Sequence, residues 1–306
     1  MFRTVIINQG EKISTRNNWL IVSIEGEERK IPIDDIYSIV LDNQQTVVTI
    51  PTIIALTNSG VHILVCNDKH MPAAVVFSHN MHYRPLNVIR KQINMLPELK
   101  NAIWKEVIRA KLCNQARVLE LCHANLLKSE RLYELADEVV DGDDGNIEGI
   151  GAKLYFRALF GADFIRMNDD GINSALNYGY AIIRSAVSKT LAAYGYNCVL
   201  GIHHINENNP FNLADDLMEP LRPLIDLWVD EHHEDLLDGL TKQQRNELVN
   251  LVNQFVMCDK KKMRVRNAID KYISSFTTSI EKENPMLIKF PIIIKNSSSI
   301  EDEGDE

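Results

Sequence analysis

The sequence predicts a two-domain α+β protein, with a β-rich N-terminal domain followed by an all-α C-terminal domain. Short β-branched runs separated by polar turns fill residues 1–78, a pattern typical of strands. Apolar residues recur at three- and four-residue spacings through most of residues 99–288, a pattern typical of helices. The 306 residues are 45% apolar, which is enough for real cores and excludes a mainly disordered chain.

The N-terminal domain is predicted to contain several short strands and one helix. Strands are expected at residues 4–7, 20–24, 30–33, 36–41, 46–50 and 61–66. So few residues separate them that a compact β unit is favoured. Residues 51–59 are predicted to be helical, because Pro51 opens the segment and Gly60 follows its end.

The rest of the chain is predicted to be a linker, a helical domain and a tail. Residues 79–98 are polar and contain Pro85 and Pro97, so we expect a linker there. Residues 289–306 end in a run of Asp and Glu and are predicted to be a disordered acidic tail. Helical patterns occur at residues 103–126, 147–160, 172–194, 213–237 and 242–276.

The net charge of −9, from 33 Lys and Arg against 42 Asp and Glu, at first argues against a nucleic-acid partner. The acids are clustered, however. Seven lie in residues 134–148 without a Lys or Arg, ten lie in residues 207–238 with one Arg, and five lie in residues 301–306. The remainder of the chain therefore has a net positive charge, and DNA stays a possible partner.

The sequence also indicates a reduced, cytoplasmic environment. No apolar stretch is long enough to span a bilayer, and the N-terminus reads as a strand rather than as a targeting signal. The five cysteines are scattered and form no Cys-x-x-Cys pair, so neither a disulfide framework nor a zinc knuckle is indicated. The chain has no Gly-x-Ser-x-Gly, phosphate-binding Gly-Lys-Ser/Thr or Rossmann glycine motif.

Three segments hold candidate catalytic groups. Glu148 follows an acidic loop at the start of a helix, where a carboxylate either caps the helix or belongs to a site. His204 lies in a turn-prone stretch and is either a structural side chain or a ligand. Asp216 and Glu219 share one helix face. They form either a solvated surface or a site where solvent, Arg222 or a cation offsets their repulsion.

Carboxylates and an imidazole together are suitable ligands for Mg²⁺ or Mn²⁺, and the imidazole favours Mn²⁺ somewhat. Such an ion suits phosphodiester chemistry, because it neutralises the phosphoryl group and stabilises the oxygen that leaves. The spacing along the sequence does not by itself show that the three segments lie close together in the fold.

Two further segments each allow two interpretations. His232 and His233 are either metal ligands or a solvated helix surface, and the basic run 260–266 is either a solvated helix face or a phosphate contact.

Taken in order, the motifs resemble the CRISPR-associated integrase-endonuclease family (Cas-one), in particular its type II form. The resemblance covers roughly residues 1–288. Four motifs carry it: Glu-Gly-x-x-Ala-x-x-Tyr-Phe from Glu148, Asn-x-x-Leu-Asn-x-x-Tyr from Asn173, Gly-x-x-His from Gly201, and Asp-Leu-Met-Glu-x-x-Arg-Pro from Asp216.

The resemblance implies a catalytic helical domain and a homodimer formed largely through the β domains. It assigns metal binding and catalysis to Glu148, His204 and Glu219, with Asp216 as an auxiliary acid. Many family members have Asp where this chain has Glu219. The implied activity is antiviral spacer acquisition, in which the 3′-hydroxyl of a short foreign DNA attacks a phosphodiester at the repeat of a CRISPR array. Metal-dependent nuclease activity is implied at the same site.

The implied partners are DNA, a second copy of the chain, and the small protein Cas-two, with two Cas-one dimers flanking one Cas-two dimer. A ring-forming adaptation protein and the RNA-guided effector nuclease are implied for type II systems. Phosphate contacts are expected from Arg84, Arg90, Lys91, Lys153 and Arg157. The alternatives are a metal-dependent nuclease without an integration role, and a non-catalytic DNA-end-binding module whose acids are only caps and surface charge.

Overall fold

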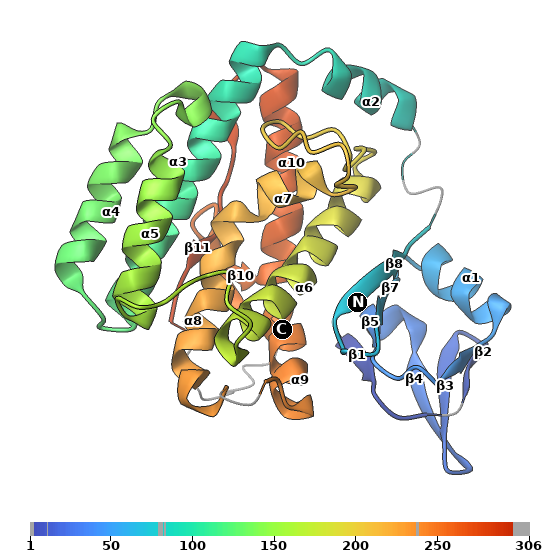
Figure 1. The fold of residues 1–306 in the computed structure, drawn as a ribbon. Helices are drawn as coiled ribbons and strands as arrows, with labels where there is room; N and C mark the ends of the chain where they lie inside the picture. Colours follow the sequence, from blue (N-terminus) through green and yellow to red (C-terminus); the bar gives the residue numbers. More distant parts are fainter. Residues whose placement is uncertain (1–2, 11, 79–81, 83, 237–238, 296–306) are drawn as a thin grey trace.

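The computed structural model describes residues 3–10, 12–78, 82, 84–236 and 239–295. Figure 1 shows a β-rich N-terminal part lying beside a larger, mainly helical C-terminal part. The predicted α+β, two-domain fold class is confirmed. Within the described residues, no helix combines the length and the apolar character that crossing a membrane requires.

Two four-stranded sheets build the N-terminal domain. The first has the order β1-β5-β7-β8, with parallel β1, β5 and β7 and an antiparallel β8 at the edge. The second has the order β4-β3-β2-β6, and all its pairs except β2 with β6 are antiparallel. The strands are β1 (Arg3–Ile7), β2 (Lys12–Arg16), β3 (Trp19–Ile24), β4 (Glu27–Pro32), β5 (Ile36–Leu41), β6 (Val47–Val48), β7 (His62–Cys66) and β8 (Pro72–Val76).

Apolar side chains from both sheets form the core of this domain. β5 lies inside its sheet and is apolar at nearly every position, as expected for a strand covered on both faces. The helix predicted at residues 51–59 is confirmed as α1 (Ile50–Asn58), and its Leu56 packs into the same core. The strands β2 and β8 were not predicted, because β2 has a single buried residue, Ile13, and β8 begins with a proline at the sheet edge.

Two long helices organise the C-terminal domain. α6 (Gly171–Ala193) is buried along most of its length, and α3 (Pro97–Leu121) packs against α4, α5 and α8. The other helices are α2 (Pro85–Ile93), α4 (Leu126–Glu138), α5 (Ile147–Phe160), α7 (Asn212–Met218), α8 (Arg222–His232), α9 (Lys242–Asn250) and α10 (Val265–Glu281). Short 3₁₀ segments lie at Ile33–Asp35, Asp141–Asp143, Glu219–Leu221, His233–Asp235, Leu251–Asn253 and Pro285–Leu287.

The helical domain also contains a three-stranded antiparallel sheet that was not predicted. Its order is β10 (Lys261–Arg264), β9 (Phe255–Cys258) and β11 (Ile292–Ile293). The helix predicted at residues 242–276 is therefore interrupted. Most of the basic run forms β10, the second strand of a hairpin with β9, and Asp259 and Lys260 in the turn have positive φ angles of 50° and 64°.

The predicted linker and tail also need correction. Residues 79–98 are not only a connection, since they contain α2, which Figure 1 shows crossing one end of the helical domain. A tail from residue 289 is wrong for residues 289–295, because Ile293 is fully buried and pairs with Val256 of β9. The end of the predicted tail, residues 296–306, lies outside the described residues.

Candidate active site

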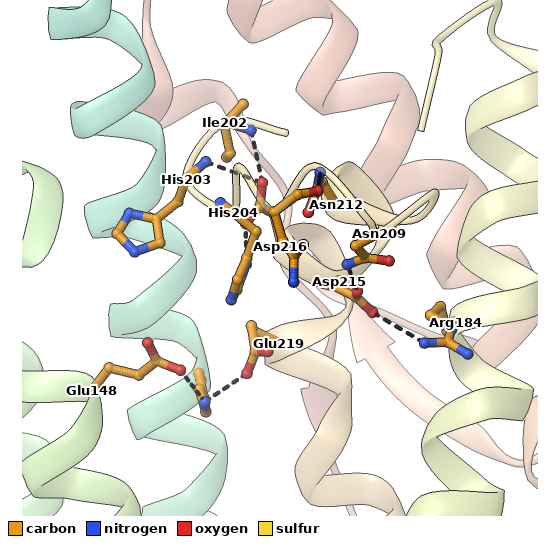
Figure 2. A network of polar contacts seen from close by, with 12 residues as sticks. Glu148, Arg184, Ile202, His203, His204, Asn209, Asn212, Asp215, Asp216 and Glu219 are labelled. Carbon is orange, nitrogen blue, oxygen red and sulfur yellow. Dashed lines mark hydrogen bonds and ion pairs between the residues drawn. The ribbon is translucent and has the colours of Figure 1, made fainter. Parts of the chain in front are cut away.

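The structure brings the three predicted segments together beside α3. Glu148 comes from the first turn of α5, His204 from the loop between α6 and α7, Asp216 from α7 and Glu219 from the following 3₁₀ turn. Figure 2 shows the side chains of Glu148, His204 and Glu219 converging on one region. The sequence motifs alone could not show that these side chains lie close together.

A buried lysine joins the two glutamates. Lys111 lies in the middle of α3 and is 7% exposed. Its Nζ atom lies 2.6 Å from Oε1 of Glu148 and 2.5 Å from Oε2 of Glu219. Burial disfavours the charged ammonium, but the charges of Glu219 and Glu148 outweigh burial and raise the pKa of Lys111 above its ordinary value. The site thus stabilises a cation between two carboxylates.

Glu219 is held on its other side by Arg222. The guanidinium Nε donates to Oε1 of Glu219 at 2.8 Å, and the same guanidinium lies 4.7 Å from the ring centroid of Tyr180. Burial alone would raise the pKa of Glu219, but Arg222 and Lys111 outweigh it and lower that pKa below its ordinary value. Arg222 therefore supplies the positive charge expected to offset the repulsion between Asp216 and Glu219. Lys111 supplies a second positive charge.

Asp216 organises the histidine loop. Its carboxylate is fully buried and accepts backbone N–H groups from Ile202, His203 and His204 at 2.7, 3.1 and 3.0 Å. It also lies 2.6 Å from Nδ1 of His204. Because a carboxylate only accepts, Nδ1 is the protonated nitrogen of this pair, and Nε2 is left for another partner. The hydrogen bond to Asp216 raises the pKa of His204 against the effect of partial burial.

Two contacts fix the loop on which His204 lies. The ring of His203 stacks on buried Trp104 of α3, with centroids 4.1 Å apart and planes 4° apart, and Trp104 meets His204 edge-on. Gly201 has no room for a side chain, because an added Cβ would lie 2.2 Å from the carbonyl oxygen of His204. His203 thus packs against α3 while His204 faces the acids.

Glu148 is not the cap of its helix. Asp143 fills that role, because its carboxylate accepts the N–H groups of Ile147 and Glu148 at 2.9 and 3.0 Å. The Glu148 side chain is therefore available to Lys111. Close helix packing brings it there, since Gly151 meets α3 with no space for a Cβ beside Leu112.

Sequence reasoning missed three contributors from α3, namely Trp104, Lys111 and Asn114. Asn114 donates to the carbonyl oxygens of Pro220 and Pro291 at 2.7 and 2.9 Å, which holds the turn that carries Glu219. One signal was present in the sequence. Lys111 occupies an apolar-stripe position of an otherwise regular amphipathic helix, and a charged residue there needs a buried partner.

The five predicted phosphate contacts are all exposed. Arg84 precedes α2, and Arg90 and Lys91 lie in its last turn, whereas Lys153 and Arg157 lie on α5. Arg90 and Lys91 line a groove of about 630 Å³ between α2, the start of α3 and the end of α10. Lys91 also pairs with Glu281 at 2.8 Å. The predicted contacts thus fall on or next to two separate helices, α2 and α5.

The other histidine pair does not resemble a metal site. His232 stacks on Trp228 with ring centroids 4.1 Å apart, and the Nδ1 atom of His233 bonds the carbonyl oxygen of Asp230. Among the described residues, no three His, Cys, Asp or Glu side chains lie close enough to hold a metal as they stand. At the candidate site the donor types suit Mg²⁺ or Mn²⁺, and an ammonium already lies between the two carboxylates.

Together, the fold and the site define a two-domain α+β protein whose helical domain gathers two acids and a histidine around a buried cation. A family model described as CRISPR associated protein Cas1 matches residues 4–232. The chain is also 37% identical over 295 residues to a CRISPR-associated endonuclease Cas1 from Neisseria meningitidis serogroup C, covering 96% of this chain and 97% of that protein. The chain therefore belongs to the Cas1 family, as the motifs predicted.

Solved structures share the fold at low sequence identity. A casposase bound to integration product matches with a TM-score of 0.73 and 19% identity, covering 92% of this chain and 91% of that one. A Cas1 protein from Thermotoga maritima matches with a TM-score of 0.68 and 14% identity, covering 91% and 97%. A Cas6-RT-Cas1–Cas2 complex matches with a TM-score of 0.73 and 18% identity, covering 96% of this chain and 36% of that one.

Proposed function

We propose that the chain is the metal-dependent DNA endonuclease and integrase of a type II CRISPR adaptation system, working in the cytoplasm. The observation that carries the proposal is the convergence of Glu148 and Glu219 on one buried cation beside His204. The name of the Neisseria relative, an endonuclease, and the casposase with its integration product support the same chemistry.

In this proposal Glu148, His204 and Glu219 hold one Mg²⁺ or Mn²⁺ ion. When bound, the ion supplies polarisation of the target phosphate and stabilises the charge on the oxygen that leaves. The protein contributes orientation. Asp216 fixes the His204 ring through Nδ1, so that Nε2 is the free donor atom, and Arg222 holds Glu219 in place. Glu219 has a longer side chain than the Asp that many family members have at this position. The hydrogen bond from Arg222 holds this longer side chain in place.

The proposed reaction joins the 3′-hydroxyl of a short captured DNA to a phosphodiester at the CRISPR repeat. One P–O bond forms as another breaks, so the exchange needs no energy source. The same site also runs the reverse reaction, and water in place of the 3′-hydroxyl gives hydrolysis.

The proposed assembly is a homodimer that joins Cas-two in a heterohexamer, and two matching structures are described as Cas6-RT-Cas1–Cas2 complexes. Side chains on the β domain suit a protein interface, since Trp19, Val47, Ile50 and Ile54 are apolar and 43–67% exposed. We also propose contacts with the type II ring-forming protein and effector nuclease. DNA would contact Arg84, Arg90, Lys91, Lys153 and Arg157.

A strand-transfer assay tests the proposal. The protein and its small partner are incubated with Mn²⁺, labelled DNA bearing free 3′ ends, and a plasmid carrying the repeat. We expect joined product, reduced at least about 100-fold in Glu148→Ala and in His204→Ala, because each removes a metal ligand. Asp144→Asn, in the exposed part of the same acidic loop, is the matched control and should keep full activity.

Each of the other outcomes would indicate a different function for the protein or a different set of catalytic residues. Cleavage without joining would indicate a nuclease with no integration role. DNA binding without either reaction would indicate a non-catalytic module that binds DNA ends. Strand transfer that survives in Glu148→Ala or His204→Ala would contradict the assignment of those residues.

A further inference from the structure

We propose that Lys111 is a built-in competitor of the divalent ion: its ammonium holds Glu148 and Glu219 together in the metal-free protein and sets how tightly the site binds Mn²⁺. The inference rests on the proposed function, since it concerns the same carboxylates. It assigns a role to a residue that lies outside all the family motifs quoted above.

The position of Lys111 is that of a counter-ion rather than of a surface lysine. It comes from the centre of a 25-residue helix, and its side chain is 9% exposed. The ion pairs found for it in the described residues are those with Glu148 and Glu219, which come from two other elements. A buried ammonium is costly unless it is paired, and so is a buried carboxylate such as Glu219. Each therefore stabilises the other when no metal is bound.

The same oxygens would be needed by a metal. Mg²⁺ binds oxygen ligands at about 2.0–2.1 Å, and Nζ of Lys111 now contacts Oε1 of Glu148 and Oε2 of Glu219. The charges are already balanced, because Lys111 and Arg222 offset the two glutamates. A divalent ion would add two positive charges to these four groups, whose charges already balance. Lys111 must therefore leave these oxygens for the ion to bind them both.

Removing the ammonium should then strengthen metal binding and weaken the metal-free fold. Lys111→Met keeps an unbranched side chain as far as Cε and removes the charged Nζ atom. We expect its affinity for Mn²⁺ to rise at least about tenfold, a change within the range measured for close charge pairs. Its melting temperature without metal should fall, because the ammonium between Glu148 and Glu219 is lost and only Glu219 keeps a cationic partner, Arg222. Saturating Mn²⁺ should raise the melting temperature more in the variant than in the wild type.

The measurements are calorimetric titration of the full chain with MnCl₂ and thermal unfolding with and without MnCl₂. Lys105→Met is the matched control, because Lys105 lies on the same helix but pairs with exposed Asp141 at 3.2 Å, away from the two glutamates. Its Mn²⁺ affinity should equal that of the wild type. Lys111→Gln is a second test variant, since its amide donates to either carboxylate and so protects the fold. It should show the same direction of change.

An unchanged or weaker Mn²⁺ affinity in a folded Lys111→Met or Lys111→Gln protein would overturn the inference. If neither variant folds without metal, their refolding on addition of MnCl₂ supports it, and failure to refold contradicts it. If wild type, control and variants all fail to bind Mn²⁺, the proposed metal site itself is wrong. That result is distinguishable, because a failed inference leaves the wild-type protein binding Mn²⁺.

Discussion

At the scale of single residues, Asp216 has the largest influence on the geometry of the site. Its carboxylate accepts four hydrogen bonds, three from the backbone of the histidine loop and one from the His204 ring. The motif comparison gave it only an auxiliary role. The structure shows why a carboxylate is needed, since both of its oxygens accept.

We predict that Asp216→Asn lowers the free energy of unfolding by about 1–3 kcal/mol, because its amide NH₂ would face backbone donors that then lose their acceptor. Strand transfer should fall at least about tenfold, since the His204 ring loses its fixed orientation. Urea unfolding and the joining assay measure the two effects. Asp215→Asn is the control, because Asp215 accepts from Asn209 and lies 3.8 Å from Arg184, so it takes no part in the hydrogen bonds that hold residues 202–204. Equal stability of Asp216→Asn and wild type would contradict this account.

A second buried acid, Asp226 on α8, makes stability depend on pH. Burial raises its pKa to about 7, although Tyr180 donates a hydrogen bond to Oδ1 at 2.5 Å and opposes that shift. In the unfolded chain an aspartate titrates near pH 4. Between about pH 4 and pH 7 the folded state therefore binds more protons than the unfolded state, and this group makes stability fall as pH rises through that window.

Asp226→Asn should remove this contribution. We predict that the stability of the variant relative to wild type rises between about pH 4 and pH 7, by on the order of a few kcal/mol, and stays constant above. Urea unfolding at several pH values measures the difference. Glu234→Gln, an exposed change just beyond the same helix, should leave the pH profile of the wild type unchanged. Parallel profiles for Asp226→Asn and wild type would rule out the buried acid as the cause.

At the scale of elements, regular patterns predicted the structure well. The helix expected at residues 147–160 is α5 with the same bounds, and the strand expected at residues 36–41 is β5. The stretch 213–237 was interpreted as one helix, but Pro220 and Pro223 each lack a backbone N–H, and a 3₁₀ turn separates α7 from α8. This break places Glu219 on a turn, outside a regular helix.

The candidate site was predicted only in part, for a physical reason. The motifs identified Glu148, His204 and Glu219, because these residue types suggest chemistry on their own. In the apolar pattern of α3, Trp104 is only one more apolar residue, and Lys111 is only a polar residue that interrupts the apolar face. Only the packing of α3 against α5 and the histidine loop shows what they contact.

That packing gives a prediction for α5. At Gly151 an added Cβ would lie 2.2 Å from Cδ2 of fully buried Leu112. Gly151→Ala should therefore lower the free energy of unfolding by about 1–3 kcal/mol despite its higher helix propensity, because it overpacks the contact. It should also weaken Mn²⁺ binding by moving Glu148. Gly145→Ala is the control, since its Cβ would make an ordinary 3.6 Å contact with Ile147. A Gly151→Ala protein as stable as wild type would show that α5 adjusts freely.

At the scale of the whole molecule, the structure changes the meaning of the acidic cluster at residues 134–148. Most of its members form ion pairs or caps. Glu134 and Glu138 pair with Arg131, Asp137 pairs with Arg109, and Asp143 caps α5. Glu148 is the member that faces Lys111. A count of charges along the chain could not separate these roles, because it ignores the basic partners that α3 and α4 supply.

DNA binding should therefore depend on exposed cations rather than on the net charge. Each cation that contacts a phosphate releases counterions, so its loss should reduce the slope of log K against log salt concentration by about one. We predict such a reduction for Lys153→Gln and Arg157→Gln on α5, and for Arg90→Gln on α2. The effect of Lys91→Gln should be smaller, because Lys91 already pairs with Glu281. Titrations of labelled DNA at several salt concentrations measure each slope.

Lys128→Gln on α4 and Lys242→Gln on α9 are the controls, since both remove an exposed cation from a helix with no predicted DNA contact. If they lower the slope as much as the α2 and α5 variants do, binding follows total charge, and no DNA path has been located. If only the α5 variants lower it, DNA approaches along the helix that begins at Glu148, and the groove beside α2 has another role. A loss confined to both predicted helices would show that the DNA contacts α2 and α5 together.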